Sequence, residues 1–200
     1  MSTLSTTENR VLMAQARESL KGRWGLVVGT VAVYMLAMGA IQYIPNRVAS
    51  GLIPILIAGP MSIGLAIFAL AISRRQDAKF SQIFDGFQKF GVGLGAVILM
   101  TIFIILWALL LFIPGIIASL SYSMTYYIIA ENDSIGPLEA ITKSKEMMRG
   151  NKWKLLCLWF RFFGWGLLCI LTLGIGFFWL APYLIVSYAQ FYDDLKENRE

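Results

Sequence analysis

The stretch GVGLGAVILMTIFIILWALLLFI, residues 91–113, decides the class of this protein. It carries no charged side chain, and it exceeds the roughly 20 apolar residues that a helix needs to cross a bilayer. The whole chain agrees, because 58% of its 200 residues are apolar, 14% are charged and the mean hydropathy is +0.67. Soluble domains carry about 25% charged residues. The sequence therefore predicts an integral membrane protein.

Two further apolar runs precede this stretch and three follow it. We predict an all-α polytopic membrane protein that forms one domain over residues 1–200, with six transmembrane helices in three hairpins. The predicted spans are about residues 24–44, 52–73, 91–113, 116–130, 155–171 and 177–191. The fourth and sixth are short, at about 22 Å against a hydrocarbon core of about 30 Å. They either borrow flanking residues or do not cross fully.

Charged segments separate the spans and predict the orientation. Residues 1–23 and 131–154 have the spacing of amphipathic helices on the membrane surface, and residues 192–200 form a charged tail. With six crossings, fifteen of the 17 Lys and Arg residues fall on one side, and only Arg47 falls in an opposite loop. The positive-inside rule then places both termini and these helices on the cytoplasmic face of a bacterial cytoplasmic membrane.

The composition argues against several classes of function. The chain has no histidine, and its two cysteines, Cys157 and Cys169, would lie about 18 Å apart on one helix, too far to bridge. No predicted span contains a carboxylate, and no nucleophile, zinc or nucleotide motif is present. We therefore expect no enzyme, no catalytic residue, no metal and no cofactor. The net charge of +5 favours anionic lipid headgroups over nucleic acid, because the cations lie between apolar runs.

Arg161 is the sharpest single candidate, because it lies inside the fifth span. A charge within a span is costly and is a functional hypothesis by default. Arg161 would bind a lipid phosphate, pair with Glu131 or Asp133, or simply extend to the interface. The last two alternatives are favoured at this stage.

The fourth span is unusually polar for a helix that faces lipid. Its candidate cavity-lining residues are Ser119, Ser123, Tyr126 and Tyr127. Hydroxyl groups in spans more often bond between packed helices than line a wet cavity. Packing is therefore favoured over a cavity.

Prolines and glycines punctuate the spans. Pro54 and Pro60 are expected to interrupt the second span, Pro182 to break or kink the sixth, and Pro114 to mark the turn between the third and fourth. The patterns Gly25-x-x-x-Gly29 and Gly91-x-x-x-Gly95 permit close helix contact, either within the chain or in a dimer.

Several motifs together resemble DUF975, a bacterial family of integral membrane proteins of unknown function. They are Ile113-Pro114-Gly115-Ile116-Ile117, Ala140-x-x-x-Ser144-x-x-x-Met148-x-Gly150-Asn151-x-Trp153, Leu173-Gly174-Ile175-Gly176, Pro182-Tyr183 and the opening Asn9-Arg10 with Leu20-Lys21-Gly22-x-Trp24. The likeness runs over nearly the whole chain. Residues 144–153 also resemble, distantly, the membrane domain attached to some glycerophosphodiesterases. The resemblance implies bacterial origin and membrane location, but no reaction.

The leading hypothesis is a non-enzymatic membrane protein that acts through protein or lipid contacts, in envelope maintenance, regulation, assembly or protection against a membrane-active agent. Its expected partners are anionic lipids, and a membrane protein or a second copy of the chain is possible. Besides Arg161, the candidate contact residues are Lys143, Lys145, Arg149, Lys152, Trp153 and Lys154. The alternative is a small transporter or lipid-translocating protein that uses the polar fourth span and Arg161.

Overall fold

The computed structural model describes residues 7–40, 47–110, 112–172, 174 and 176–198, and every element in this part of the chain is helical. The all-α prediction is therefore confirmed for the described residues. In chain order the elements are α1 (Asn9–Leu20), α2 (Trp24–Ala40), α3 (Arg47–Ser73), α4 (Gln82–Asp85), the 3-10 helix η2 (Gly86–Lys89), α5 (Phe90–Leu110), α6 (Phe112–Tyr122), α7 (Thr125–Glu131), α8 (Pro137–Met147), α9 (Lys152–Leu171) and α10 (Phe177–Glu197).

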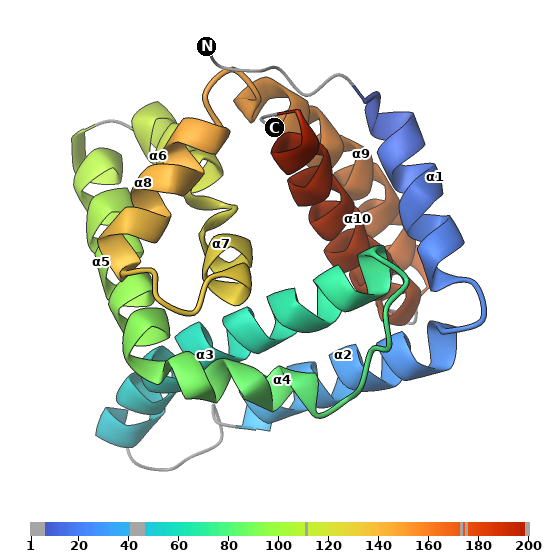
Figure 1. The fold of residues 1–200 in the computed structure, drawn as a ribbon, viewed down its shortest axis with the longest axis horizontal. Coiled ribbons are helices and arrows are strands. Elements are labelled where there is room, and N and C mark those ends of the chain that lie inside the picture. Colours follow the sequence, from blue (N-terminus) through green and yellow to red (C-terminus); the bar gives the residue numbers. More distant parts are fainter. Residues whose placement is uncertain (1–6, 41–46, 111, 173, 175, 199–200) are drawn as a thin grey trace.

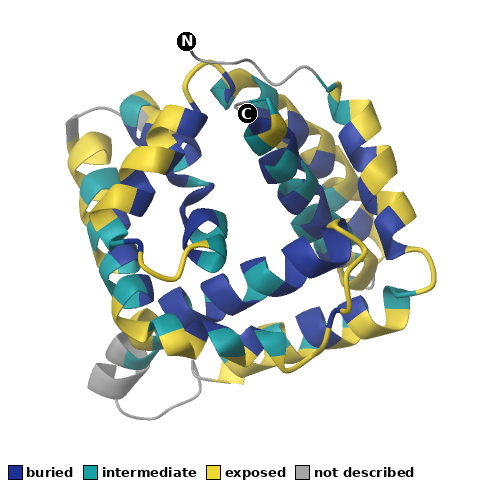
Figure 2. Cartoon of the chain, in the orientation of Figure 1, coloured by how far each residue is buried: buried dark blue, intermediate teal, exposed yellow. Residues whose placement is uncertain are grey.

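Helix α3 is the central element of the fold. It contacts α5 and α7 on one side and α1 and α10 on the other, as Figure 1 shows. Helices α5 to α8 form one group and α1, α9 and α10 form a second group. The buried side chains line the inward faces of both groups and much of α3 (Figure 2). The largest of them on α3 include Ile63, Phe68 and Ile72.

Four segments are long and apolar enough to cross a membrane, by length and composition. They are Ile53–Ser73, Gln82–Leu109, Ile113–Glu131 and Lys152–Leu171. The number is five if α1 and α2, which meet at 99°, count as one span. The predicted spans at 24–44 and 177–191 fall on α2 and α10, and residues 41–44 lie outside the described part of the chain. Six crossings and their pairing in hairpins stay a prediction.

The prolines do not end the helices as expected. Helix α3 continues through Pro54 and Pro60, and α10 continues through Pro182. A proline removes one backbone hydrogen bond, and the remaining bonds and the packing of the helix are sufficient to carry it past that point. Pro114 lies in the first turn of α6, so the turn between α5 and α6 comes before it.

Two predicted segments have different limits. The fourth run is divided into α6 and α7 by a turn at residues 123–124. The predicted charged tail is largely the end of α10, where Tyr192, Asp194 and Leu195 are buried. Tyr192 and Leu195 are three residues apart, so they lie on one face of the helix, which packs against the rest of the molecule.

Glycines allow α3 to pack backbone to backbone against the segment from α4 to α5. A Cβ atom on Gly64 would overlap the carbonyl group of Ile83, and one on Gly86 would overlap the carbonyl oxygen of Pro60. Gly59 and Gly93 approach each other in the same way. By contrast, Cβ atoms on Gly25, Gly29 and Gly91 would meet nothing within 4 Å. These three glycines thus make no close contact within the described structure, and the contact expected of Gly25-x-x-x-Gly29 inside the chain is absent.

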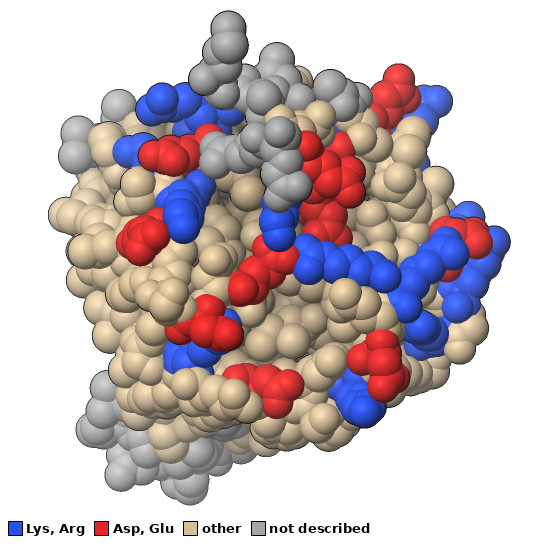
Figure 3. All heavy atoms as spheres, in the orientation of Figure 1, with Lys and Arg blue, Asp and Glu red and all other residues tan. Residues whose placement is uncertain are grey.

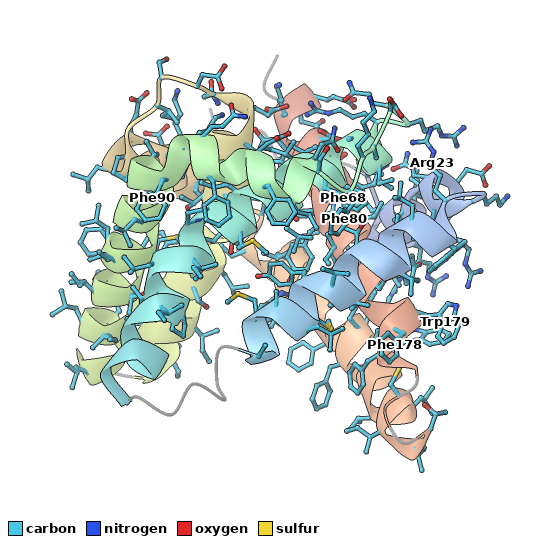
Figure 4. All side chains as sticks on the ribbon, turned by 90° about the horizontal axis from the view of Figure 1, so that it is seen from below. Arg23, Phe68, Phe80, Phe90, Phe178 and Trp179 are labelled. Atoms are coloured by element: carbon cyan, nitrogen blue, oxygen red, sulfur yellow. The ribbon has the colours of Figure 1, made fainter. Side chains whose placement is uncertain are left out.

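Charged side chains collect at one end of the helix bundle. They are spread over the face that Figure 3 presents, and Figure 4 shows polar side chains along one edge of the molecule with Phe178 and Trp179 toward the opposite edge. Many large apolar side chains of α5 and α9 are exposed on the sides, among them Leu109, Phe160 and Leu171. Exposed apolar sides below a polar face are what a bilayer stabilises.

Substitution of Gly64 by alanine is expected to destabilise the fold strongly. The added methyl group overlaps backbone atoms that cannot move aside independently, so the loss should exceed about 2 kcal/mol. Gly29→Ala is the matched control, since it adds the same atom to open space and improves helix propensity by about 0.5–1 kcal/mol. Thermal unfolding of both variants in one detergent checks this, and equal midpoints would contradict the packing described here.

Candidate functional site

Glu131, at the end of α7, accepts bonds from three side chains on two other segments. Arg74 donates to one carboxylate oxygen. Tyr192 and Lys196 of α10 donate to the other, at 2.7 and 3.0 Å. The Glu131 side chain is only 12% exposed. A carboxylate so enclosed is engaged in holding α7 against α10, and it is not placed to act on a substrate.

Arg74 extends this network across the polar face. Its guanidinium also donates to Asp193 of α10, at 2.6 and 3.1 Å. The hydroxyl of Ser73, the last residue of α3, donates to the other oxygen of Asp193 at 2.8 Å. We call Ser73, Arg74, Glu131, Tyr192, Asp193 and Lys196 the polar clasp. It joins the ends of α3, α7 and α10 at one level.

Two more cations have structural partners. The ammonium group of Lys89 donates to the carbonyl oxygens of Ile129 and Ala130, at 2.7 and 3.0 Å, where it stabilises the negative end of α7. It also pairs with Asp133 at 2.8 Å, and this contact holds the pKa of the Asp133 carboxyl below its ordinary value. Lys154 lies 3.3 Å from Asp194 and mostly inside. Lys154 is thus turned inward, away from the lipid-contact surface predicted for it.

Other predicted contact residues remain on the surface. Lys143 is paired with Glu139 at 3.1 Å, one turn away on α8. Lys145, Arg149 and Lys152 form no salt bridge with any carboxylate of the described residues. Lys145 and Arg149 are close enough to Lys152 for their charges to act on it. With Trp153, which is 72% exposed, these three cations form what we call the basic surface.

A cavity of about 560 Å³ opens beside the basic surface, between α5 and α8. Its walls are mainly apolar, and Lys145 is one of its lining residues. The others include Phe103, Leu106, Trp107, Leu138 and Ile141. An apolar crevice with a cation beside it is suited to an amphiphile with an anionic head.

Arg161 lies on the exposed face of α9, among exposed aromatic side chains such as Phe160 and Phe163. The expected pairing with Glu131 or Asp133 is wrong, because Glu131 is bound by Arg74 and Lys196 and Asp133 by Lys89. Like the basic surface, Arg161 forms no salt bridge with a described carboxylate. The two other predicted roles of Arg161, extension of its side chain to the membrane interface and binding of a lipid phosphate, stay predictions.

The polar side chains of the fourth run are used in packing. Ser119 and Ser123 donate to the carbonyl oxygens of Ile116 and Leu120, at 2.8 Å each, within their own segment. Tyr127 stacks on Tyr192 with ring centres 5.5 Å apart. Tyr126 bonds to Ser62 of α3. Tyr126 and Tyr127 thus contact other helices, whereas the hydroxyl groups of Ser119 and Ser123 bond within their own segment and do not distinguish packing from a cavity.

Ser144 of α8 bonds to backbone groups on both sides of the turn between α6 and α7. Its hydroxyl donates to the carbonyl oxygen of Ser121 at 2.8 Å and accepts from the amide of Met124 at 3.2 Å. Both backbone groups lie beside the turn at 123–124, and Ser144 is completely buried. Ala140 and Met148, one turn to either side, are also completely buried. The stripe Ala140-Ser144-Met148 therefore fixes α8 on the two shorter helices.

Comparison with known families agrees with the motif in this region. The sequence pattern of the family described as "Protein of unknown function (DUF975)" matches residues 109–199. Residues 109–199 are thus similar to DUF975. No curated protein and no solved structure matches the chain. The likeness of the opening motif around Trp24 lies outside the matched residues, and the likeness to the glycerophosphodiesterase-associated domain is not supported.

The DUF975 motif that begins at Ala140 is explained by structure. Ala140, Ser144 and Met148 form the buried stripe, and Asn151 is 2% exposed. Gly150 has a φ of 86°, which ends the turn after α8 in a conformation that favours glycine. The motif therefore positions the basic surface, and its exposed member Trp153 belongs to that surface.

The polar clasp was not predicted. Its members are polar and charged residues at the ends of apolar runs, and its charged members belong to no motif. One signal was available, because Arg74, Glu131 and Asp193 each follow an apolar run that ends on the same predicted side. Charges of opposite sign at one level of a bundle are expected to pair.

Ser144→Ala is expected to lower the free energy of unfolding by about 1–3 kcal/mol, because it leaves a buried amide and carbonyl unpaired. Ser123→Ala removes the same kind of hydroxyl group, but its partner, the carbonyl oxygen of Leu120, belongs to the same helical segment. The free energy of unfolding should therefore change by no more than about 0.5 kcal/mol. Unfolding of the two variants in detergent measures the difference. Equal losses would show that Ser144 does not bridge the break.

Proposed function

We propose that this chain is a non-enzymatic multi-pass membrane protein that acts by binding anionic lipid headgroups through its basic surface. The observation that carries the proposal is the contrast between paired and unpaired charges. Most of the acidic and basic groups near the centre of the polar face neutralise one another in the polar clasp. Lys145, Arg149 and Lys152 form no salt bridge with a described carboxylate. They lie at the edge of the polar face, beside an apolar cavity.

The membrane explains why such a surface persists. Each Lys or Arg near an anionic bilayer surface contributes about 1 kcal/mol of attraction. Three cations together then contribute about 3 kcal/mol of attraction to an anionic membrane surface. Trp153 is exposed next to them, and tryptophan favours the level of the headgroups. The arrangement requires that the polar face lies at the cytoplasmic surface, as the distribution of cations predicts.

The geometry gives less support to the alternative, a small transporter or lipid-translocating protein. That hypothesis relies on the fourth run as a polar path, and the hydroxyls of Ser119 and Ser123 bond to their own backbone. Arg161 is exposed on the surface of α9. We therefore propose a role in lipid contact, with envelope maintenance or regulation as the processes it serves.

Neutralising Lys145, Arg149 and Lys152 to glutamine should remove the preference for anionic lipid. The test reconstitutes the full chain into vesicles of equal parts phosphatidylglycerol and phosphatidylcholine. It compares the immobilised fraction of spin-labelled forms of each lipid at low and high salt. The wild type should favour phosphatidylglycerol, less so at high salt because exposed charges are screened, and the triple variant should favour it several-fold less.

The matched control is Lys21→Gln with Lys79→Gln and Lys143→Gln. It removes the same three charges, but each of these lysines already pairs with a carboxylate, namely Glu18, Asp77 and Glu139. The control should keep most of the preference. If both triple variants lose it equally, net charge alone is responsible and the basic surface is not a site. No preference in the wild type would also overturn the proposal.

A further inference from the structure

A second cavity, of about 450 Å³, lies on the other side of the molecule between α1, α9 and α10. These helices lie side by side in Figure 1. Three tryptophans line the cavity, one from each of α2, α9 and α10. We call it the tryptophan pocket and define it by Arg17, Trp24, Trp165, Leu168, Trp179 and Leu180. Apart from Arg17 these side chains are apolar or aromatic, so the pocket suits a hydrocarbon chain.

Two arginines mark one end of this region. Arg17 lines the tryptophan pocket and Arg161 lines a groove beside it. The pocket is also lined by Tyr183, which carries a hydroxyl group. That hydroxyl donates to the carbonyl oxygen of Met13 at 3.0 Å and is not an anion. Neither arginine forms a salt bridge with a described carboxylate. Two cations without a described carboxylate partner, one in the pocket and one in the adjoining groove, are complementary to an anion that comes from outside the chain.

Arg161 lines a groove of its own, of about 490 Å³, on the outer surface of α9. Trp165 and Leu168 belong both to this groove and to the tryptophan pocket. The two side chains therefore form a ridge with an apolar channel on either side. A molecule with one head and two chains matches this shape, with a chain in each channel.

The length of the site also fits a membrane lipid. At 1.5 Å per residue, α9 rises about 16 Å from Arg161 to Thr172 at the far end of the pocket. One leaflet of the hydrocarbon core is about 15 Å thick, half of the whole core. Trp179 lies toward the edge opposite the polar side chains in Figure 4. The site is therefore long enough to hold acyl chains of the length that one leaflet contains.

We propose that the tryptophan pocket and the adjoining groove hold one anionic phospholipid of the surrounding membrane. Its phosphate lies between Arg17 and Arg161, and its acyl chains lie on either side of the ridge of Trp165 and Leu168. The site shares no residue with the basic surface, so it goes beyond the proposed function and does not depend on it. It also gives Arg161 a reason to lie within a span, since a phosphate compensates its charge.

The experiment counts bound lipid on the purified full chain. Native mass spectrometry in mild detergent, with phosphatidylglycerol as the added probe, should show one lipid that resists dilution. A phosphatidylglycerol with a photoreactive diazirine in its acyl chain should attach to peptides that contain Trp165, Leu168 or Trp179. The double variant Arg17→Gln with Arg161→Gln should retain at least tenfold less of this lipid, and both arginines are exposed, so the fold is expected to be preserved.

Two controls keep the outcomes distinct. Arg10→Gln with Lys21→Gln removes two exposed cations from the same end of the molecule, outside the pocket, and should retain the lipid. The triple variant of the basic surface should also retain it, so failure of one proposal leaves the other standing. Equal retention in the wild type and the double variant would overturn the inference. Attachment of the photoreactive lipid equally to all exposed helices would overturn it too, and so would phosphatidylcholine binding as well as phosphatidylglycerol.

Discussion

The contact of Arg74 with Glu131 and Asp193 is the interaction on which the arrangement of the polar face depends. Arg74 directly follows α3, the central helix, and its two partners lie at the end of α7 and on α10. One side chain thus fixes the two groups of helices at a common level. Helix α8 packs on α6 and α7 through Ser144. The contact of Arg74 with Glu131 positions α7, and through α7 it also positions α8 and the basic surface. Removal of a partner from such an enclosed pair costs far more than loss of an exposed one.

The charges of the chain divide into two sets with different roles. Those near the centre of the polar face are paired and structural, as in the polar clasp, the contact of Lys89 with α7 and the pair of Lys154 with Asp194. Those at the edges, the basic surface and the arginines at positions 17 and 161, lack a carboxylate partner among the described residues. Both edge sets adjoin apolar cavities. A bilayer with anionic headgroups complements this division, because it supplies hydrocarbon and phosphate at the same boundary.

The helical, membrane-like character and the candidate cations could be predicted from the sequence, since they follow from local composition and from positions along the chain. The glycine contacts could not, because Gly64 meets Ile83 and Gly86 meets Pro60 only after distant segments have packed. The spacing Gly25-x-x-x-Gly29 left contact within the chain and contact in a dimer open, and the open space beside both glycines removes only the first. Ser144 stood in a recognised motif, but its purpose became visible only with the turn at 123–124. Lys154 and Arg161 lie two turns apart on the same side of α9, and only the fold shows that Lys154 meets Asp194 while Arg161 stays exposed.

The side of the membrane that the polar face occupies tests the account most directly. In a variant with Cys157 and Cys169 replaced by serine, single cysteines are placed at Lys21, Lys143 and Thr172. Intact cells and permeabilised cells are then exposed to a maleimide that cannot cross the membrane. The account predicts that cysteines at positions 21 and 143 react only after permeabilisation. The cysteine at position 172, which follows the C-terminal end of α9, should react in intact cells. Reaction of position 21 or 143 in intact cells would contradict it, because the basic surface would then lie on the wrong side to meet the anionic cytoplasmic leaflet.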